Sequence, residues 1–435
     1  MEKKNNLLEK IFYTFCLAVF LLPLERIGSI SYAGVNIRFS QILILLIFVL
    51  YFAYSLFQKK LEIKFPKPLV LYVLFIIVCL ISLIGAKEKM RGLMISIFLS
   101  FMAIVPFVSV FVLDNKEKIK KVTKVLLISA LLFSAFGIFQ FFGDIIGLPN
   151  SITGLSDRYV KAVLGFPRIQ STFIEPLYFA NYLIIPMMLT IFLALRKGNS
   201  KKNFYTFILL SIFFLIVTIL TLSKGALASL AIVVLGIVIF QVRSIFSKEN
   251  ITYLLVTLLV IFSLGWMTIS TLQSQPDFDK FYNKAYEIVM GGSVTERQEA
   301  YSVASEAYYS NPVIGIGVGN FGPYFSGYPV SAPDFGWPIA NNEYLEIVSE
   351  TGMVGLIFFL AFLLSILYYS YSAFKHSNDS FLKAVLLALN FALVGILIQY
   401  MTFSTLYIMH IWFLIGFILA IQQIIFEDVK NKKIN

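Results

Sequence analysis

The feature that most constrains this chain is a series of long apolar stretches. Most of them run for roughly 18 to 25 residues, the length of helix that crosses a hydrocarbon core of about 30 Å. Of the 435 residues, 59% are hydrophobic and 14% are charged, which is too little charge to cover a soluble domain of this length. We therefore predict an all-α, polytopic membrane protein, because a helix satisfies its own backbone hydrogen bonds in lipid.

We predict about twelve transmembrane helices and treat residues 1–435 as one integral membrane domain. The first apolar stretch has no small-residue cleavage site and many further stretches follow it, so it is interpreted as a span and not as a signal peptide. The predicted spans lie near 11–25, 39–57, 68–85, 92–113, 125–147, 172–195, 204–222, 225–242, 251–271, 343–371, 382–404 and 407–426.

The basic residues indicate the orientation. With both termini in the cytoplasm, 23 of the 35 Lys and Arg residues lie inside and 12 lie outside, as the positive-inside rule favours. The outer turn at 87–91, with its three cations, runs against the rule. This topology explains the net charge of +11 better than nucleic-acid binding does. We predict a multi-pass protein of the cytoplasmic membrane with long outer segments at 148–171 and 272–342.

The 272–342 segment is predicted to be a large extracytoplasmic loop that contains short helices and the catalytic residues. A Ser followed three residues later by Glu, at 293–296, has the form of a capping box and predicts a helix that runs to about Tyr309. Arg297 falls in the first turn, where a cation opposes the helix dipole. It is either an anion-binding residue or a surface Arg paired with a nearby Glu such as Glu299.

Glycines at alternate positions follow this helix, at Gly315, Gly317 and Gly319. They resemble a phosphate-binding loop, but a nucleotide site needs a preceding strand and a βαβ unit, which the sequence lacks. Tight turns and close backbone approach explain these glycines better. Five nearby aromatic residues are predicted either to stack on sugar rings or to form an interfacial belt: Tyr324, Phe325, Tyr328, Phe335 and Trp337.

Three acids then lead into an apolar span at helical spacing, so Glu343, Glu346 and Glu350 share one face. Charges that enter a span are costly unless they face the bundle or a wet cavity. The alternative is an interfacial helix end, where Glu is favoured near the N-terminus. For Glu343 both interpretations stay open, and for Glu350 the helix-end interpretation is preferred.

Further charged residues lie at the predicted outer face. Arg168 and Glu175 lie at the outer start of the sixth span, and Lys224 lies in a tight hairpin, where the alternative is that it simply reaches the interface. His376 and His410 are each isolated and are interpreted as structural. The two cysteines lie in apolar stretches, which predicts neither a disulfide framework nor a Cys/His metal site.

The order of these motifs resembles the O-antigen ligase and polymerase family over roughly residues 165–415. The series is a basic residue in a short hairpin, an Arg in a loop helix, Asn-Pro-x-x-Gly-x-Gly-x-Gly-Asn-Phe and Asn-Asn-x-Tyr-Leu-Glu-x-x-x-Glu-Thr-Gly-x-x-Gly. The resemblance implies a membrane glycosyltransferase of cell-envelope polysaccharide biosynthesis, acting on glycans linked to a polyprenyl diphosphate such as undecaprenyl diphosphate. It also implies a metal-independent reaction without a cofactor.

The chain departs from the family pattern in two places. Members commonly have Ser-Arg-Gly at the hairpin, where this chain has Lys224, a point charge without the bidentate fork of Arg. Ligases usually carry His where this chain has Asn341, which cannot act as a general base at neutral pH. The stretch Thr172-Phe-Ile-Glu175-Pro176 instead resembles a pattern of polysaccharide polymerases.

The resemblance therefore implies roles for eight residues. Arg297, Lys224 and Arg168 are expected to bind the donor diphosphate. Glu175 or Glu343 is expected to accept the proton of the acceptor hydroxyl, and the nearby cations are expected to depress the pKa of Glu175. The expected sugar-orienting and substrate-binding residues are Asn341, Asn342 and Tyr344.

We predict a polymerase of lipid-linked oligosaccharide repeat units. The alternatives are a ligase that transfers the glycan to another acceptor and, more distantly, a lipid-linked glycan flippase, for which midplane charges would be expected. The predicted partners are the lipid-linked donor and acceptor glycans, membrane lipids, a flippase and a chain-length regulator, without nucleic acid.

Overall fold

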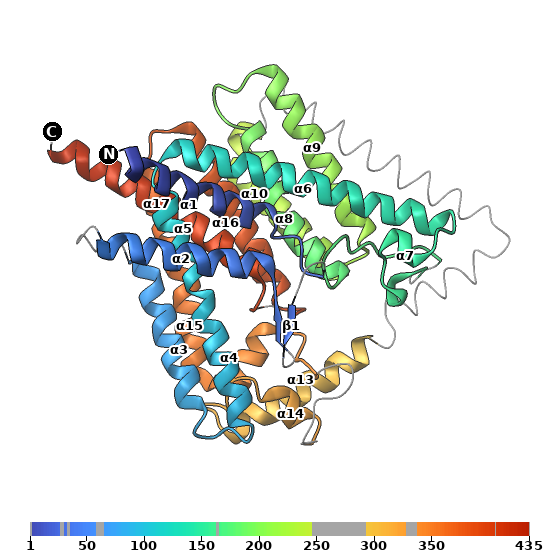
Figure 1. The fold of residues 1–435 in the computed structure, drawn as a ribbon. Coiled ribbons are helices and arrows are strands. Elements are labelled where there is room, and N and C mark those ends of the chain that lie inside the picture. Colours follow the sequence, from blue (N-terminus) through green and yellow to red (C-terminus); the bar gives the residue numbers. More distant parts are fainter. Residues whose placement is uncertain are drawn as a thin grey trace.

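The structure is a computed structural model that describes residues 2–26, 30–32, 35–57, 65–161, 165–245, 293–327, 337–404 and 406–434. It is a helical bundle with several short helices at one end (Figure 1). Its longer helices are α1 (Glu2–Phe20), α2 (Phe39–Phe57), α3 (Lys67–Ser82), α4 (Lys89–Met102), α5 (Ile104–Val112), α6 (Lys116–Ile145), α8 (Pro176–Ala194), α9 (Lys201–Leu220), α10 (Lys224–Ile245), α13 (Ser293–Ser310), α15 (Glu343–His376), α16 (Ser380–Gln399) and α17 (Met409–Ile434). The short helices are α7 (Asn150–Thr153), η1 (Asp157–Tyr159) and α14 (Phe321–Phe325).

The prediction of a polytopic all-α protein is confirmed in its main features. Within the described residues, eight helical segments are long and apolar enough to cross a membrane, with α4 and α5 forming one of them. Helices α3 and α10 are shorter apolar helices at two further predicted spans. The span predicted at 251–271 lies outside the described residues, so the total of twelve stays a prediction. A small antiparallel hairpin of β1 (Ile30–Tyr32) and β2 (Val35–Ile37) departs from all-α character.

Two helices lie at the centre of the bundle. Most residues of α8 and α17 are buried, including Tyr182 and Trp412. Helix α8 packs against α9 and α16, and α17 packs against α5. A helix that is apolar on all sides is expected to be enclosed by others, so the sequence of α8 explains its central position. This position matters because α8 begins at the candidate site described below.

One end of the bundle, here called the terminal face, gathers the two chain ends with the turns next to them. Lys116 forms an ion pair with Asp379. The ammonium group of Lys118 lies 5.7 Å from the centre of the Phe12 ring in α1, and Figure 1 shows both chain ends on this side. The grouping agrees with the predicted topology, and the exposure of this face to the cytoplasm remains a prediction from the charge rule.

The opposite end, here called the loop face, gathers the segments that were predicted to lie outside. The Asn320 side chain accepts a hydrogen bond from the Glu88 amide at 2.8 Å. The Tyr301 hydroxyl of α13 donates to the Met401 carbonyl at 3.2 Å. The helix predicted to run to about Tyr309 is confirmed as α13, which ends at Ser310 directly before the Asn-Pro pair.

Candidate active site

The segment before α8 is held in place by polar contacts at the loop face. The Gln140 side chain accepts a hydrogen bond from the Ser171 amide at 2.7 Å and donates one to the Ser171 carbonyl at 3.0 Å. Ser171 has a φ of 53°, and the Thr172 hydroxyl donates to the Pro23 carbonyl at 2.7 Å. Side-chain amides that mimic a backbone partner fix such irregular segments. The orientation of the residues that follow is therefore defined.

Glu175 is the residue that precedes α8. It occupies the N-cap position, yet its side chain makes no capping hydrogen bond to the helix amides. Burial raises the pKa of Glu175, and the positive charges of Arg158 and Arg168 only partly oppose this effect. The expectation of a depressed pKa was wrong, because desolvation outweighs the nearby cations. A raised pKa makes Glu175 a stronger base than an exposed Glu.

Arg168 is held beside Glu175 by two contacts. Its guanidinium lies 5.8 Å from the centre of the Tyr159 ring, and its Nε donates to the Thr221 carbonyl at 3.3 Å. Both contacts leave most of the guanidinium donors for other partners, since Arg carries five N–H groups. The Thr221 contact also joins the segment before α8 to the turn before α10.

Lys224 and Arg297 complete a group of cations. Lys224 is the first residue of α10, and its charge interacts with those of Arg297 and Arg168. Arg297 lies one turn before Ala300 on the same face of α13, and Ala300 belongs to a small buried cluster that seats α13. We call Arg168, Lys224 and Arg297 the cationic cluster. Like charges repel, so their assembly from three segments favours an anionic ligand.

Sequence reasoning missed two charged residues of this region, Glu25 and Arg38. The Glu25 carboxylate is 2% exposed and lies 3.6 Å from the Arg38 guanidinium. Burial raises the pKa of Glu25, while Arg38 and the Ile174 amide oppose the shift. The amides of Glu25 and Arg26 both donate to the Thr172 carbonyl. The sequence did contain a signal for this ion pair, namely one charged residue of each sign at the two ends of the short loop between the first two spans.

The predicted residues at the start of α15 are engaged in supporting the fold. Asn342 is the N-cap, and its side chain accepts from the amides of Tyr344 and Leu345 at 3.1 Å each. Glu343 is 3% exposed and accepts from the Leu406 amide at 3.0 Å. The Tyr344 hydroxyl donates to the Leu397 carbonyl at 2.8 Å. Asn341, at a φ of 52°, is half-buried beside this start.

The glycine-rich loop packs against the next turn of α15. The Glu350 carboxylate accepts from the amides of Gly319 and Phe321 at 2.7 and 2.9 Å. Gly315, Gly317 and Gly319 all have positive φ, which confirms the prediction of tight turns. A Cβ on Gly315 would lie 2.3 Å from the Glu350 carbonyl group, so close approach also requires glycine there. Glu350 was expected to lie at an interfacial helix end, but it is buried and binds this loop.

Helix α15 is also broken, where the sequence predicted one continuous span. Gly352 has φ 66° and ψ −173°, a conformation that is essentially restricted to glycine. The break lets the Met353 amide donate to the Pro312 carbonyl at 2.9 Å. Arg91 holds the loop from the other side, because its Nε donates to the Gly319 carbonyl at 2.6 Å. Arg91, one of the three cations of the outer turn at 87–91, therefore helps to hold the fold together.

The remaining predicted features are placed as follows. His410 bonds to the Asn181 side chain at 2.8 Å and His376 bonds to the Ser372 carbonyl at 2.8 Å, as structural histidines would. Tyr324 donates to Glu306 at 3.4 Å, and the guanidinium of Arg91 lies 5.4 Å from the Trp337 ring centre. Two of the five predicted aromatic residues, Tyr328 and Phe335, lie outside the described part of the chain. Within the described part, no three His, Cys, Asp or Glu side chains are grouped as metal ligands.

Comparison with known proteins supports the resemblance of the motifs. Residues 206–360 match the family model described as O-antigen ligase. The matched stretch contains Lys224, Arg297 and the start of α15, whereas Arg168 and Glu175 precede it. No curated protein matches the chain.

Proposed function

Because residues 206–360 match the family model described as O-antigen ligase, and the described residues include eight helical segments able to cross a membrane, we propose that this chain is a membrane protein of that family and polymerises oligosaccharide repeat units carried on a polyprenyl diphosphate. The reaction takes place at the loop face, which is the outer face of the cytoplasmic membrane in the predicted topology. The observation that carries this proposal is the proximity of the cationic cluster, through Arg168, to the half-buried carboxylate of Glu175. Glycosyl transfer from a lipid diphosphate needs both kinds of group.

The cationic cluster would act on the donor. When the bond between the anomeric carbon and the diphosphate oxygen breaks, negative charge develops on the leaving diphosphate. Arg297, Lys224 and Arg168 would stabilise this charge by preorganised electrostatics and charge-assisted hydrogen bonds. Lys224 at the start of α10 opposes the helix dipole, and a bound diphosphate would offset this unfavourable position.

Glu175 would act on the acceptor. The acceptor hydroxyl oxygen forms the new bond to the anomeric carbon, and its proton passes to the Glu175 carboxylate. The raised pKa of Glu175 and its lack of a capping bond both support this role. Glu343 is the competing base. Its carboxylate is buried against the Leu406 amide, which favours Glu175.

Asn341, Asn342 and Tyr344 are proposed to orient the sugar at the edge of this site. Asn341 takes the position of the ligase His in the family pattern, and its half-buried amide offers hydrogen bonds without proton transfer. Asn342 and Tyr344 are proposed to act only indirectly, because the Asn342 oxygen caps α15 and the Tyr344 hydroxyl donates to the Leu397 carbonyl. Their contribution would come from holding Asn341 in place.

Reconstituted protein given one lipid-linked repeat unit tests the proposal. We expect a ladder of longer lipid-linked products, because each product is again a donor or an acceptor. A matched reaction with the Arg297→Ala variant should give no ladder. Turnover of the wild-type protein without any product longer than two units would contradict polymerisation.

The second candidate function is that of a ligase, and the description of the matched family model favours it. A ligase would make one transfer to an acceptor that is not itself a repeat unit. The same reconstitution separates the two functions when such an acceptor, for example a lipid-anchored core glycan, competes with the repeat unit. A single transfer to this acceptor without a ladder would replace our proposal with the ligase function.

A further inference from the structure

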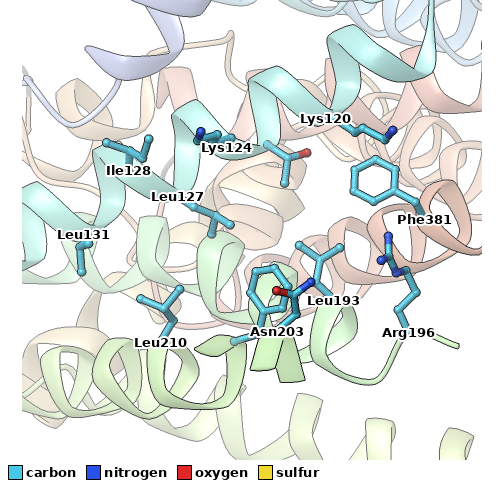
Figure 2. Close-up of a pocket in the computed structure, with 12 residues that line it drawn as sticks. Lys120, Lys124, Leu127, Ile128, Leu131, Leu193, Arg196, Asn203, Leu210 and Phe381 are labelled. Carbon is cyan, nitrogen blue, oxygen red and sulfur yellow. The ribbon is translucent and has the colours of Figure 1, made fainter. Parts of the chain in front are cut away.

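A cavity of about 300 Å³ lies at the terminal face, toward the end of α8 that is remote from Glu175. Figure 2 shows the residues that line it. Four elements line it: α6, the end of α8, the start of α9 and the start of α16. Helix α8 connects the two regions, since it begins after Glu175 and contributes Leu193 near its other end to the cavity. Neither the family match nor the proposed reaction accounts for this cavity.

The lining of the cavity is divided into a basic and an apolar part. Lys120 and Arg196 lie at one end, as Figure 2 shows, while Leu131 and Leu210 lie toward the other. Lys120 and Leu131 are eleven residues apart on α6, or roughly 16 Å at 1.5 Å per residue. The basic end belongs to the start of α6, so the apolar part extends into the predicted span. Ile128 and Leu131 remain 43% and 40% exposed.

The basic end offers charge without an opposing carboxylate among the residues that line the cavity. Arg196 lies 5.8 Å from the centre of the Phe381 ring, and its buried Nε has no hydrogen-bond partner among the described residues. Lys120 pairs with Glu117 at 2.7 Å, an exposed contact of little strength. Lys124, one turn after Lys120 on α6, and Asn203 lie between the two ends of the cavity (Figure 2). Asn203 lies in the first turn of α9, where an anion is favoured.

We propose that this cavity binds an anionic membrane phospholipid. The phosphate of the headgroup would bind Lys124 and Arg196, with Lys120 exchanging Glu117 for the lipid. One acyl chain would lie along Leu127, Leu131 and Leu210. This explains why the cavity extends beyond its basic end along apolar side chains. A small free anion would leave this apolar part unexplained. In the predicted topology the terminal face meets the leaflet in which anionic lipids are typical partners of basic residues.

Binding of lipids to the purified full-length protein tests this proposal independently of catalysis. The protein is titrated in zwitterionic phosphatidylcholine nanodiscs with phosphatidylglycerol, and bound lipid is counted by native mass spectrometry. The double variant Lys124→Gln/Arg196→Gln should weaken retention of phosphatidylglycerol by roughly tenfold or more. Lys197→Gln is the matched control, because Lys197 is exposed in the same turn and does not line the cavity.

Two further arms identify the source of the anion. Leu131→Trp should weaken phosphatidylglycerol binding while the basic end stays intact, and inorganic phosphate should not displace the lipid. Should the double variant fold poorly, Lys124→Gln alone gives the same comparison. Equal retention in the basic variants and in Lys197→Gln would overturn the proposal. So would displacement by inorganic phosphate with no effect of Leu131→Trp, which would indicate a headgroup site only.

Discussion

Two regions of the loop face use their polar residues in different ways. At the start of α15, Asn342 caps its own helix, while Glu343 and Glu350 bond to backbone amides of neighbouring segments. In the cationic cluster and at Glu175, charges of one sign meet and a carboxylate at a helix start leaves the helix amides uncapped. The first region therefore resembles scaffold and the second resembles a binding site.

The comparison teaches how to interpret motifs that a sequence makes conspicuous. The longest motifs here surround the glycines and the start of α15, and they are best explained by one loop packed on one broken helix. The residues with unfavourable placements are single charges in short motifs. Placements that cost stability are expected where a ligand supplies the compensation. The predictions below test whether this division is correct.

The largest effect is expected from Arg297→Ala. It should lower the rate of glycan transfer by roughly 2–4 kcal/mol of transition-state stabilisation, as for a removed oxyanion donor. Arg297→Lys should already lose much of the activity, because Lys lacks the bidentate fork. Initial rates at equal protein level measure this. Lys202→Ala, an exposed cation of the terminal face, is the control, and similar rates for Arg297→Ala and this control would refute the role.

The scaffold region should respond in stability and not in chemistry. A Cβ on Gly352 would lie 2.1 Å from the Val313 oxygen at a φ of 66°. Gly352→Ala should therefore destabilise the fold by more than about 3 kcal/mol. Gly236→Ala in α10, whose Cβ would have its nearest neighbour at 3.5 Å, should be neutral. Thermal unfolding in detergent measures the difference, and equal midpoints would contradict the scaffold assignment.

A smaller loss is expected from Lys224→Gln, roughly tenfold in rate, as for one charge-assisted contact of about 1.4 kcal/mol. The same change should not lower thermal stability, because it removes a cation from a helix start. Lys224→Arg should retain activity. If Lys224→Gln instead unfolded the protein at normal specific activity, Lys224 would belong to the scaffold.

The smallest effect is a shift in the pH dependence. Because the pKa of Glu175 is raised and the ionised form is the base, kcat/KM should fall on acidification at a pH above that expected for an ordinary Glu. The charge of Arg158 lowers this pKa, so Arg158→Gln should move the acid limb to higher pH. Lys161→Gln is the nearby exposed control. An unshifted or oppositely shifted limb would contradict Glu175 as the base.

The sequence predicted the features that depend on local pattern. Apolar length predicted the membrane helices, and the Ser-to-Glu spacing predicted α13. The break at Gly352 was not predicted, because it depends on contact with Val313, almost forty residues away in the chain. The direction of the Glu175 pKa shift was predicted wrongly. The segment 168–175 shows which charges are near Glu175, but it does not show how far the fold buries its carboxylate. Glu25 and Arg38 were missed because they are thirteen residues apart in the chain, and only the folded structure brings their side chains together.

The most direct test of the central claim compares donor binding with elongation in Glu175→Gln. This change preserves the shape of the side chain and removes its charge, so the cationic cluster should still bind the lipid diphosphate. We expect elongation of the lipid-linked repeat unit to be abolished at near-normal donor affinity, whereas Glu343→Gln should keep the chemistry and lose stability. Normal ladders from Glu175→Gln, with none from folded Glu343→Gln, would contradict the account and assign the base to α15.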